Sequence, residues 1–447
     1  MRLSRFNIWV KDHPREGDYL LFNSRTQALL KIDKGFRDDL YASAVSGILK
    51  PRIEENINAL KSNGIIASDK EEEDAKLDDF FGQLKYECGG LAFEATILTT
   101  YSCNFRCVYC FEESVKERVF LDKETSSLIV EWLIKRVRKK GLKSIFLVFY
   151  GGEPLLNPGP IYDISQRMRE WADKEGISFA FSIITNGSLM GSALADKLAP
   201  LGLKEVRVTI DGDRETHNSK RPYMDGSGTF DKIISNIKSI IHKVNIGVVG
   251  NFDRESFPGV LRLLDYLEEE GLLHRLSSIG FAPIVPRLGP KDNPKAIELS
   301  ECSSFIGENG LFNETIMLKK ELMRRGVKVK SDLAINACPL FMQDAGVTID
   351  PKGIIYKCNS FLGYPEFSVG DVREEEFNSN HGKFLNIDAW NRCPQDCPYI
   401  PMCQGGCRFF SYVENNDLYG LACKRGYLDR IVPELIKLEY ELLLKKG

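Results

Sequence analysis

Between Phe93 and Pro283, short apolar runs alternate with longer stretches whose apolar residues have helical spacing. The short runs have the length of β-strands, and the loops between the elements are short. Strands that alternate with helices in this way predict an α/β fold with a parallel sheet, closed or partly closed into a TIM-like (β/α)6 barrel. The loops that follow the strands carry the reactive groups of such a sheet. The predicted strands are Phe93–Thr99, Ser144–Tyr150, Ser178–Thr185, Glu205–Ile210, Asn245–Asn251 and Ser277–Pro283.

The sequence on either side of this unit has a different character. Residues 1–80 combine short strand-like runs with two helical patterns, the second at about Ile53–Lys61, which is the outline of a winged-helix module. The charge-rich stretch Asp69–Asp79 marks a boundary, as a solvated linker or an exposed helix. From Cys338 onward the chain is rich in loops. We therefore expect a winged-helix domain at 1–80, the partial barrel at 90–290, a bridging region at 291–330 and a C-terminal domain at 331–447.

Charge and hydropathy argue against two kinds of partner. The chain has 60 Lys and Arg against 63 Asp and Glu, and a formal net charge of -3 offers little attraction for nucleic acid. Charged residues interrupt Met1–Arg15, and no later segment has the ~20 apolar residues of a membrane span. We expect a cytoplasmic protein that binds neither nucleic acid nor membrane.

The 12 cysteines are concentrated in two regions of the chain. Three lie within Cys103–Cys110 and five within Cys393–Cys423. In a reducing compartment, close groups of thiols are metal ligands more often than disulfides. Cys88 and Cys302 stand apart from both regions, and we expect them to be plain buried thiols.

The first group, Cys103-Asn-Phe-Arg-Cys107-Val-Tyr-Cys110, directly follows the first predicted strand. Three thiolates at this spacing can bind three irons of a cubane cluster and leave the fourth iron open for a substrate or cofactor. A zinc knuckle or buried cysteines are the structural alternative. Zinc is the weaker choice because no His lies nearby.

This motif resembles the signature of the radical S-adenosylmethionine (SAM) superfamily, Cys-x3-Cys-x2-Cys with an aromatic residue, here Tyr109, before the third cysteine. The resemblance implies a 4Fe-4S cluster on Cys103, Cys107 and Cys110 as the catalytic centre. It also implies reductive cleavage of SAM to methionine and a 5′-deoxyadenosyl radical, which abstracts hydrogen from a substrate carbon.

Short motifs at the next strand ends resemble the SAM contacts of the same family. Gly151-Gly152-Glu153-Pro154 follows the second strand: the glycines permit close backbone approach, and Glu153 offers a carboxylate to the amino group of SAM. By itself this motif would equally suit an ordinary turn. The resemblance also implies methionine and ribose contacts at Thr185-Asn186-Gly187 and at Thr209–Gly212, with Asp211 as a candidate proton acceptor.

The C-terminal cysteines form a second pattern. Cys338 and Cys358 flank a predicted hairpin that turns at Pro351-Lys352-Gly353 and brings them towards each other. With Cys393, Cys397, Cys403, Cys407 and Cys423, they resemble the seven-cysteine SPASM extension of radical SAM enzymes that modify peptides and proteins. Cys393 and Cys397 are separated by three residues where the family usually has two.

This resemblance implies two auxiliary 4Fe-4S clusters, one on Cys393, Cys397, Cys403 and Cys423 and one on Cys338, Cys358 and Cys407; two zinc ribbons are the structural alternative. The three-cysteine set lacks one ligand, because Asp332 stands where some relatives have a cysteine. Asp332, Cys302 or a substrate thiolate could complete it. We favour an open iron, since several thioether-forming relatives anchor a substrate cysteine in this way.

Residues 1–80 resemble the leader-recognition domain of enzymes that mature ribosomally made peptides. Such a module captures an extended peptide as an added strand, and a DNA-binding winged helix is the alternative. Together the resemblances imply a radical SAM peptide maturase that installs thioether cross-links in a Cys-containing precursor, with a donor such as flavodoxin or ferredoxin. A sulfatase-maturing or carbon–carbon cross-linking radical SAM enzyme is the enzymatic alternative. The non-enzymatic alternative is an iron–sulfur electron carrier or a zinc-bearing interaction protein.

Overall fold

The computed structural model describes residues 1–87, 92–110, 118–284, 311–344 and 346–446. Cys88, Cys302 and the first half of the expected bridging region, residues 291–310, lie outside these ranges. Within the described ranges, no helix has both the length and the apolar character needed to cross a membrane.

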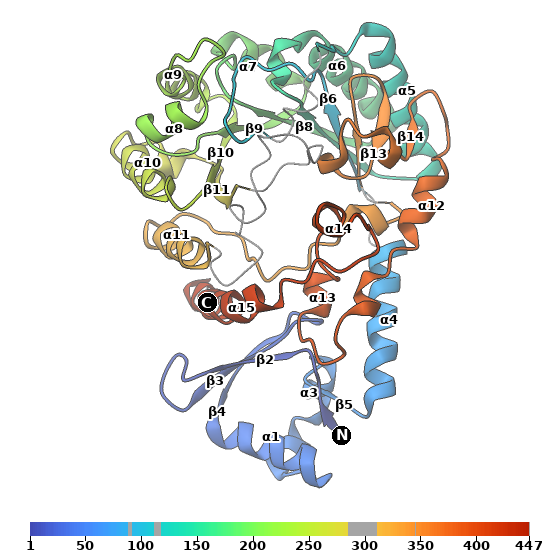
Figure 1. Cartoon of the computed structure of the whole chain (residues 1–447), viewed down its shortest axis with the longest axis vertical. Helices are drawn as coiled ribbons and strands as arrows, with labels where there is room; N and C mark the ends of the chain where they lie inside the picture. Colours follow the sequence, from blue (N-terminus) through green and yellow to red (C-terminus); the bar gives the residue numbers. More distant parts are fainter. Residues whose placement is uncertain (88–91, 111–117, 285–310, 345, 447) are drawn as a thin grey trace.

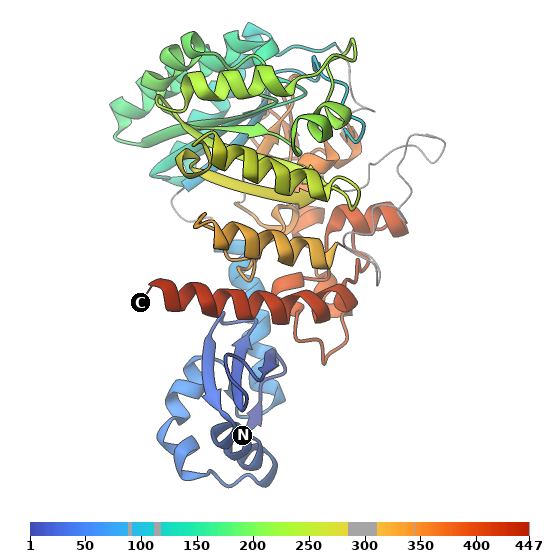
Figure 2. The ribbon, with the colours of Figure 1, turned by 90° about the vertical axis from the view of Figure 1, so that its left-hand side faces the viewer.

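A nine-stranded, mostly parallel sheet forms the larger body of the molecule (Figure 1). Its first six strands pair in parallel in sequence order, and the helices between them cover one face, as Figure 2 also shows. These strands are β6 (Ala92–Leu98), β7 (Ser144–Tyr150), β8 (Ser178–Thr185), β9 (Leu203–Thr209), β10 (Asn245–Phe252) and β11 (Ser278–Pro283). The helices are α5 (Lys123–Lys140), α6 (Pro158–Glu175), α7 (Ser192–Leu198), α8 (Arg214–Lys220), α9 (Phe230–Ile240) and α10 (Phe257–Glu269). The prediction of an α/β partial barrel is confirmed, and β7 and β8 have the predicted bounds.

The sheet continues into the C-terminal part of the chain. The predicted hairpin forms from β12 (Val347–Ile349) and β13 (Ile354–Tyr356), and β13 pairs with β14 (Gly370–Asp371). β12 also pairs in parallel with β6, so that Val347 lies opposite Ala95. The hairpin is therefore an extension of the barrel sheet, although some 250 residues separate the paired strands in sequence.

The hairpin turn is held by Asp350. Its Oδ1 accepts hydrogen bonds from the backbone N–H groups of Lys352 (2.8 Å) and Ile354 (2.9 Å). Gly353 has a φ of 87°, a left-handed conformation that glycine adopts without strain. The turn residues thus supply the local hydrogen bonds that a tight hairpin needs.

The N-terminal part is a separate small body with its own core. β2 (Asn7–Lys11), β3 (Asp18–Asn23) and β4 (Leu29–Asp33) form an antiparallel sheet, and β1 (Arg2–Leu3) pairs with β5 (Ile66–Ala67). Three helices accompany them: α1 (Lys34–Ser46), α2 (Pro51–Glu55) and α3 (Ile57–Ser62). The predicted helix Ile53–Lys61 is interrupted at Asn56, whose φ of -105° and ψ of 7° leave the helical region.

The charge-rich stretch after this body is helical. α4 (Lys70–Tyr86) begins at Asp69, whose side chain accepts a hydrogen bond from Glu72 N. Its buried residues are Leu77, Phe81, Leu84 and the charged Glu73, which pairs with Arg5. The Phe81 ring stacks on Trp390 with the centroids 3.9 Å apart and the planes 7° from parallel. Of the two expectations for this stretch, the helix is confirmed. It follows the N-terminal body, precedes β6 in the chain and runs beside the C-terminal part (Figure 1).

The C-terminal part lies between the barrel and the N-terminal body (Figures 1 and 2). Its helices are α11 (Phe312–Arg324), α12 (Ser379–Leu385), α13 (Ile400–Cys403), α14 (Arg408–Asn415) and α15 (Arg425–Lys446). α15 packs against α11 on one side and against β2 and β3 on the other. Short 3-10 turns at Pro154–Leu156, Ala199–Leu201, Leu273–Arg275, Pro339–Phe341, Asn359–Phe361, Pro365–Phe367 and Ala389–Arg392 complete the described helices.

Candidate active site

A cavity of about 310 Å³ opens at the carboxyl ends of the barrel strands. All three cysteines of the first motif line it, together with side chains that follow the neighbouring strands. This is the edge at which parallel α/β sheets keep their reactive groups. Among the predicted site residues, Cys103, Cys107, Tyr109, Cys110, Gly151, Gly152, Thr185 and Asn186 line the cavity, whereas Glu153 and Asp211 do not.

The loop that carries the three cysteines is held by the segment after α8. Arg106 N donates a hydrogen bond to Pro222 O (3.0 Å), and Val108 N donates one to Lys220 O (3.0 Å). The Phe105 side chain, between the first two cysteines, is fully buried. The backbone therefore places all three thiols at the same cavity.

The two glycines after β7 let the chain approach this loop closely. Gly151 has a φ of 140°, and a Cβ at that position would lie 2.3 Å from Thr100 O. A Cβ on Gly152 would lie 2.4 Å from Ser102 O. Gly152 N instead donates a hydrogen bond to Thr100 O (3.1 Å). The glycine pair is needed because any side chain there would meet backbone atoms.

Glu153 lies behind Thr185 and Asn186, which line the cavity. Its side chain is fully buried, and it accepts hydrogen bonds from Thr185 Oγ1 (2.7 Å), Asn186 N (2.7 Å) and Leu155 N (3.0 Å). Burial raises the pKa of Glu153, and these hydrogen bonds oppose the shift. Both carboxylate oxygens are thus engaged by the turn after β8, so this carboxylate holds two cavity residues in place.

A polar network surrounds Tyr109. The Tyr109 hydroxyl donates to Asp211 Oδ2 and accepts from Arg221 Nη1 (2.7 Å), and Asn251 Nδ2 lies 3.3 Å from it. Asp211 and Arg221 are 4.0 Å apart, and Asp211 is fully buried. Burial raises the pKa of Asp211, against the lowering effect of Arg221. Asp211 is therefore an acceptor that orients Tyr109, and it has no exposed surface from which to reach the cavity.

The cavity-lining residues that sequence reasoning missed include two with hydrogen-bonding side chains near Tyr109, Arg221 and Asn251. Asn251 is the last residue of a predicted strand, so the rule that selected Thr185 would also have found it. Arg221 follows α8 and has no local signal, because only the folding of that helix over the strand ends brings it to Tyr109.

The three-cysteine set of the C-terminal part comes together around the hairpin. Cys358 follows β13, Cys338 precedes the short turn at Pro339–Phe341, and Cys407 precedes α14. Burial raises the pKa of Cys338 to about 12, and the Cys358 and Cys407 thiols add to the shift. The Cys358 and Cys407 thiols thus act electrostatically on the Cys338 thiol.

The four-cysteine set forms a second group. Burial raises the pKa of Cys393 to about 12, and Cys403, Cys397 and Cys423 each add to the shift. Cys423 is exposed and Cys397 is buried, so the group extends from the interior to the surface.

The three groups suit the donor chemistry of iron–sulfur clusters. The ten described cysteines form no disulfide. Across the described residues, the three cysteine groups included, no three His, Cys, Asp or Glu side chains are arranged to hold a single metal ion. The ligands of a cubane each bind a different iron, so they do not need to converge on one point.

Asp332 is engaged away from the three-cysteine set. Its carboxylate pairs with the ammonium of Lys319 on α11, and its side chain is 45% exposed. Of the two protein ligands that were considered for completing the set, Asp332 thus has another partner, and Cys302 lies outside the described residues.

Residues 97–264 match the sequence model of the radical SAM superfamily. The matched segment runs from β6 into α10 and includes the cysteine loop and the strand ends that line the cavity. The chain contains a radical SAM domain. The superfamily uses SAM and a 4Fe-4S cluster, and this protein is an enzyme, as its relatives are.

The similarity to known proteins extends beyond the radical SAM domain. The cysteine-type anaerobic sulfatase-maturating enzyme of Clostridium novyi is 24% identical over 338 residues, which cover 69% of this chain and 85% of that protein. Native anSMEcpe with bound AdoMet and Cp18Cys peptide has a TM-score of 0.61 at 18% identity, over 78% of this chain and 99% of that one. Streptococcus suis SuiB bound to precursor peptide SuiA has a TM-score of 0.53 at 13% identity, over 95% of this chain and 99% of that one. At these identities the two solved structures share the fold.

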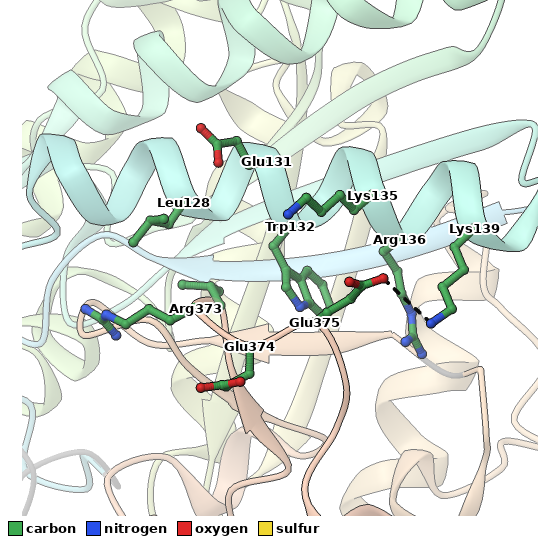
Figure 3. A pocket seen from close by; sticks show the side chains of 10 residues that line it. Leu128, Glu131, Trp132, Lys135, Arg136, Lys139, Arg373, Glu374 and Glu375 are labelled. Carbon is green, nitrogen blue, oxygen red and sulfur yellow. Dashed lines mark ion pairs between the residues drawn. The ribbon is translucent and has the colours of Figure 1, made fainter.

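A second pocket, of about 250 Å³, lies on the outer side of the radical SAM domain between α5 and the loop after β14 (Figure 3). Its lining is strongly charged, and Lys139 pairs with Glu375 at 3.8 Å. Glu131, Lys135 and Glu374 add charges of both signs. We assign no chemistry to this pocket, because its lining holds neither a cysteine nor a histidine.

Proposed function

We propose that the protein is a radical SAM peptide maturase that installs thioether cross-links in a ribosomally made, Cys-containing precursor peptide. The observation that carries this proposal is the group of Cys338, Cys358 and Cys407, whose thiols interact electrostatically, while Asp332, the carboxylate that the sequence offered as a fourth ligand, pairs with Lys319. A cubane on three thiolates has one iron free to bind the thiolate of a substrate cysteine.

The cavity of the radical SAM domain is the proposed catalytic centre. Cys103, Cys107 and Cys110 would hold the first 4Fe-4S cluster, and when bound this cluster and SAM supply the 5′-deoxyadenosyl radical. Gly151, Gly152, Thr185, Asn186 and Thr209 would enclose SAM. Glu153 and Asp211 act from behind the wall: Glu153 fixes the Thr185-Asn186 turn, and Asp211 fixes the Tyr109 ring. A rigid wall excludes water from a reactive radical.

The two C-terminal groups are the proposed auxiliary cluster sites. Cys393, Cys397, Cys403 and Cys423 would bind a fully ligated 4Fe-4S cluster, and the three-cysteine set would bind one with an open iron. β12 anchors the second site to the same sheet as the radical SAM domain. A substrate cysteine on the open iron would thus be positioned relative to the cavity, and formation of its carbon–sulfur bond releases one electron that a cluster can accept.

The N-terminal body is the proposed leader-recognition domain. A groove of about 430 Å³ lies between β4 and α3. Its lining combines apolar side chains, Leu30, Ile32, Phe36 and Leu60 among them, with polar and charged ones such as Asp33 and Arg52. β4 is an edge strand of its sheet and pairs only with β3 among the described strands. An extended peptide could add to such an edge while its side chains fill the groove.

The extent of the structural likeness supports this assignment. The likeness to SuiB bound to its precursor peptide covers 95% of the chain, which requires most of the N-terminal body, whereas the likeness to anSMEcpe covers 78%. The second candidate is the maturation of a sulfatase, which is favoured by the 24% identity to the Clostridium novyi enzyme. Both candidates need the same cavity and auxiliary clusters.

The test is an assay under anaerobic conditions with reconstituted protein, SAM and either dithionite or a reduced flavodoxin or ferredoxin. Methionine and 5′-deoxyadenosine should form. The protein is coexpressed with a short Cys-containing peptide encoded next to its gene. For each cross-link, the mass of the peptide should fall by two hydrogens and one of its thiols should no longer react with an alkylating reagent. Conversion of a sulfatase peptide's cysteine to an aldehyde, with no cross-link in the precursor, would decide for the second candidate.

A further inference from the structure

The interior between the two C-terminal cysteine groups contains an arginine. Arg408, the first residue of α14, is 1% exposed and is among the largest fully buried side chains of the described chain. No Asp or Glu of the described residues forms an ion pair with it. A guanidinium stays protonated under ordinary conditions, so this is a buried positive charge without a carboxylate partner.

Backbone carbonyls satisfy the hydrogen bonds of Arg408. Its Nη2 donates to Gly405 O (2.6 Å) and Gly406 O (2.9 Å), and its Nη1 donates to Leu418 O (3.0 Å) and Gly420 O (2.7 Å). The first two acceptors lie between Cys403 and Cys407, and the last two lie shortly before Cys423. The side chain thus ties together the two loops that carry these cysteines. It does so without cancelling its charge, because carbonyls are neutral acceptors.

The loop between Cys403 and Cys407 has a conformation that lets its carbonyl groups accept hydrogen bonds from Arg408. Gly405 and Gly406 have φ values of 79° and 91°, and a Cβ on Gly406 would lie 2.0 Å from Ala422 O. Glycine is required at such positions, since the left-handed backbone and the close contact both exclude a side chain. The two glycine carbonyls can therefore turn inward to the guanidinium.

The charge of Arg408, held between the loops that carry Cys403, Cys407 and Cys423, interacts electrostatically with thiols of both groups. Burial lowers the pKa of Arg408, and four thiols oppose that shift: Cys338 and Cys407 from the three-cysteine set, and Cys403 and Cys393 from the four-cysteine set. One buried cation is thus shared by two sets of ligands. A cubane with thiolate ligands is anionic, and its one-electron reduction adds a further negative charge, which a nearby buried cation stabilises.

We propose that Arg408 is a shared counter-charge for both auxiliary clusters, a positioning residue that raises their reduction potentials and thereby favours acceptance of the electron released when the cross-link forms. The inference rests on the proposed function, because it requires that the two cysteine groups hold clusters. A purely structural role would be confined to the hydrogen bonds that tie the loops together.

Two substitutions separate charge from hydrogen bonding. Arg408→Gln removes the charge, and Arg408→Lys keeps it but cannot make the forked contacts. Both are prepared in a Cys103, Cys107 and Cys110 to Ala background, so that only auxiliary clusters remain, and iron, sulfide and EPR-monitored reduction potentials are measured. The matched control is Arg392→Gln, one residue before Cys393, because Arg392 is 55% exposed and pairs with Asp417 at 3.5 Å.

For the glutamine variant we expect both clusters to be about tenfold harder to reduce, a shift of about 59 mV for one electron. The lysine variant and the Arg392→Gln control should stay near the parent values. Unchanged potentials in a fully loaded glutamine variant, or a shift of one cluster only, would overturn the inference. A parent protein that binds no auxiliary iron would instead refute the proposed function.

If the Arg408→Gln variant fails to bind iron, its reduction potentials cannot be measured, and a second experiment tests the inference. Protein with intact Arg408, labelled with 15N only in arginine guanidinium groups, is reduced and studied by pulsed EPR. Both auxiliary clusters should show a 15N coupling that disappears in equally labelled Arg408→Lys protein. Absence of this coupling at either cluster in the protein with intact Arg408 would contradict the shared placement of the charge.

Discussion

Tyr101 donates its hydroxyl hydrogen to Asp350 Oδ2 across 3.0 Å. Tyr101 lies two residues before the first cysteine of the radical SAM domain, and Asp350 forms the turn of the C-terminal hairpin. Both side chains are buried. This hydrogen bond joins the loop of Cys103, Cys107 and Cys110 to the part of the chain that holds the C-terminal cysteines.

Replacing Tyr101 by Phe should therefore lower the stability of the enzyme. Burial raises the pKa of Asp350 and the Tyr101 hydroxyl lowers it, so the variant leaves a buried carboxylate with one donor fewer. We expect a loss of about 1–3 kcal/mol, the usual cost of removing a hydrogen bond to a buried charged group. Anaerobic thermal unfolding measures it, and Tyr162→Phe, at a tyrosine that is 44% exposed, should leave the midpoint unchanged. Equal midpoints for the Tyr101→Phe variant and the parent would contradict the role given to this bond.

Variants of the cavity cysteines and of the C-terminal cysteines should have different effects on SAM cleavage. Cys107→Ala removes a proposed ligand at the cavity and should reduce 5′-deoxyadenosine formation to the level without enzyme. Cys397→Ala removes a ligand of the four-cysteine set and should preserve that formation while peptide modification stops. Chromatography of the nucleoside and mass spectrometry of the peptide measure the two effects. Undiminished cleavage in the Cys107→Ala variant would remove the central assignment.

Gly151→Ala should weaken SAM binding by tenfold or more. Its φ of 140° disfavours alanine, and the new methyl group would meet Thr100 O, which forces the cluster loop away from β7. Equilibrium dialysis against labelled SAM measures the affinity. Gly159→Ala is the matched control, because a Cβ there has no atom within 4 Å and the backbone is already helical. Similar affinities for both variants would show that the close approach is dispensable.

His217 predicts an acid sensitivity of the radical SAM domain. It is fully buried and accepts a hydrogen bond from Asp211 N (3.2 Å), and burial lowers its pKa from 6.5 to about 3. The unfolded chain therefore binds a proton below pH 6.5 that the folded chain does not, so stability falls as the pH decreases through this range. At pH 5.5 the contribution is about 1.4 kcal/mol. Denaturant unfolding at pH 5.5 and 7.5 measures it, and a His217→Gln variant with the same pH dependence as the parent would refute it.

The groove of the N-terminal body should bind the precursor peptide independently of the cavity. Ile32→Asp places a charge on its apolar lining and should weaken peptide binding by at least tenfold, with unchanged SAM cleavage. Val45→Asp is the control, since Val45 belongs to the same body but is 87% exposed and lies outside the groove. Fluorescence anisotropy of a labelled leader peptide measures both. Equal affinities for the two variants would place the binding site elsewhere.

Local patterns in the sequence were enough to predict the six parallel strands of the barrel and the position of the cysteine loop, although they missed the short helix α8. β7 and β8 coincide with Ser144–Tyr150 and Ser178–Thr185, because both are runs of apolar residues that are buried on both faces and bounded by clear breaks. The hairpin was predictable for a similar reason: Gly353 and its neighbours specify a tight turn within a few residues.

The roles of single side chains were decided by the tertiary structure. Glu153 was predicted to face a ligand, but the turn after β8 engages both of its oxygens, and Asp211 is likewise turned towards Tyr109. Nothing near Arg221 in sequence connects it to Tyr109. The direction of a side chain depends on its hydrogen-bond partners, which can come from segments far away in the sequence. The residues next to it in the sequence do not specify these partners.

What the amino-acid sequence determined by itself is the set of short-range features: where strands and helices lie, and where thiols are grouped. Only the tertiary structure decided that β12 pairs with β6, that Asp350 accepts a hydrogen bond from the Tyr101 hydroxyl, and that Arg408 ties together the loops that precede Cys407 and Cys423. The physical reason is that burial and strand pairing act between segments far apart in the chain. Their energies depend on the whole packed interior, whereas turn and periodicity signals depend on neighbours within a few residues.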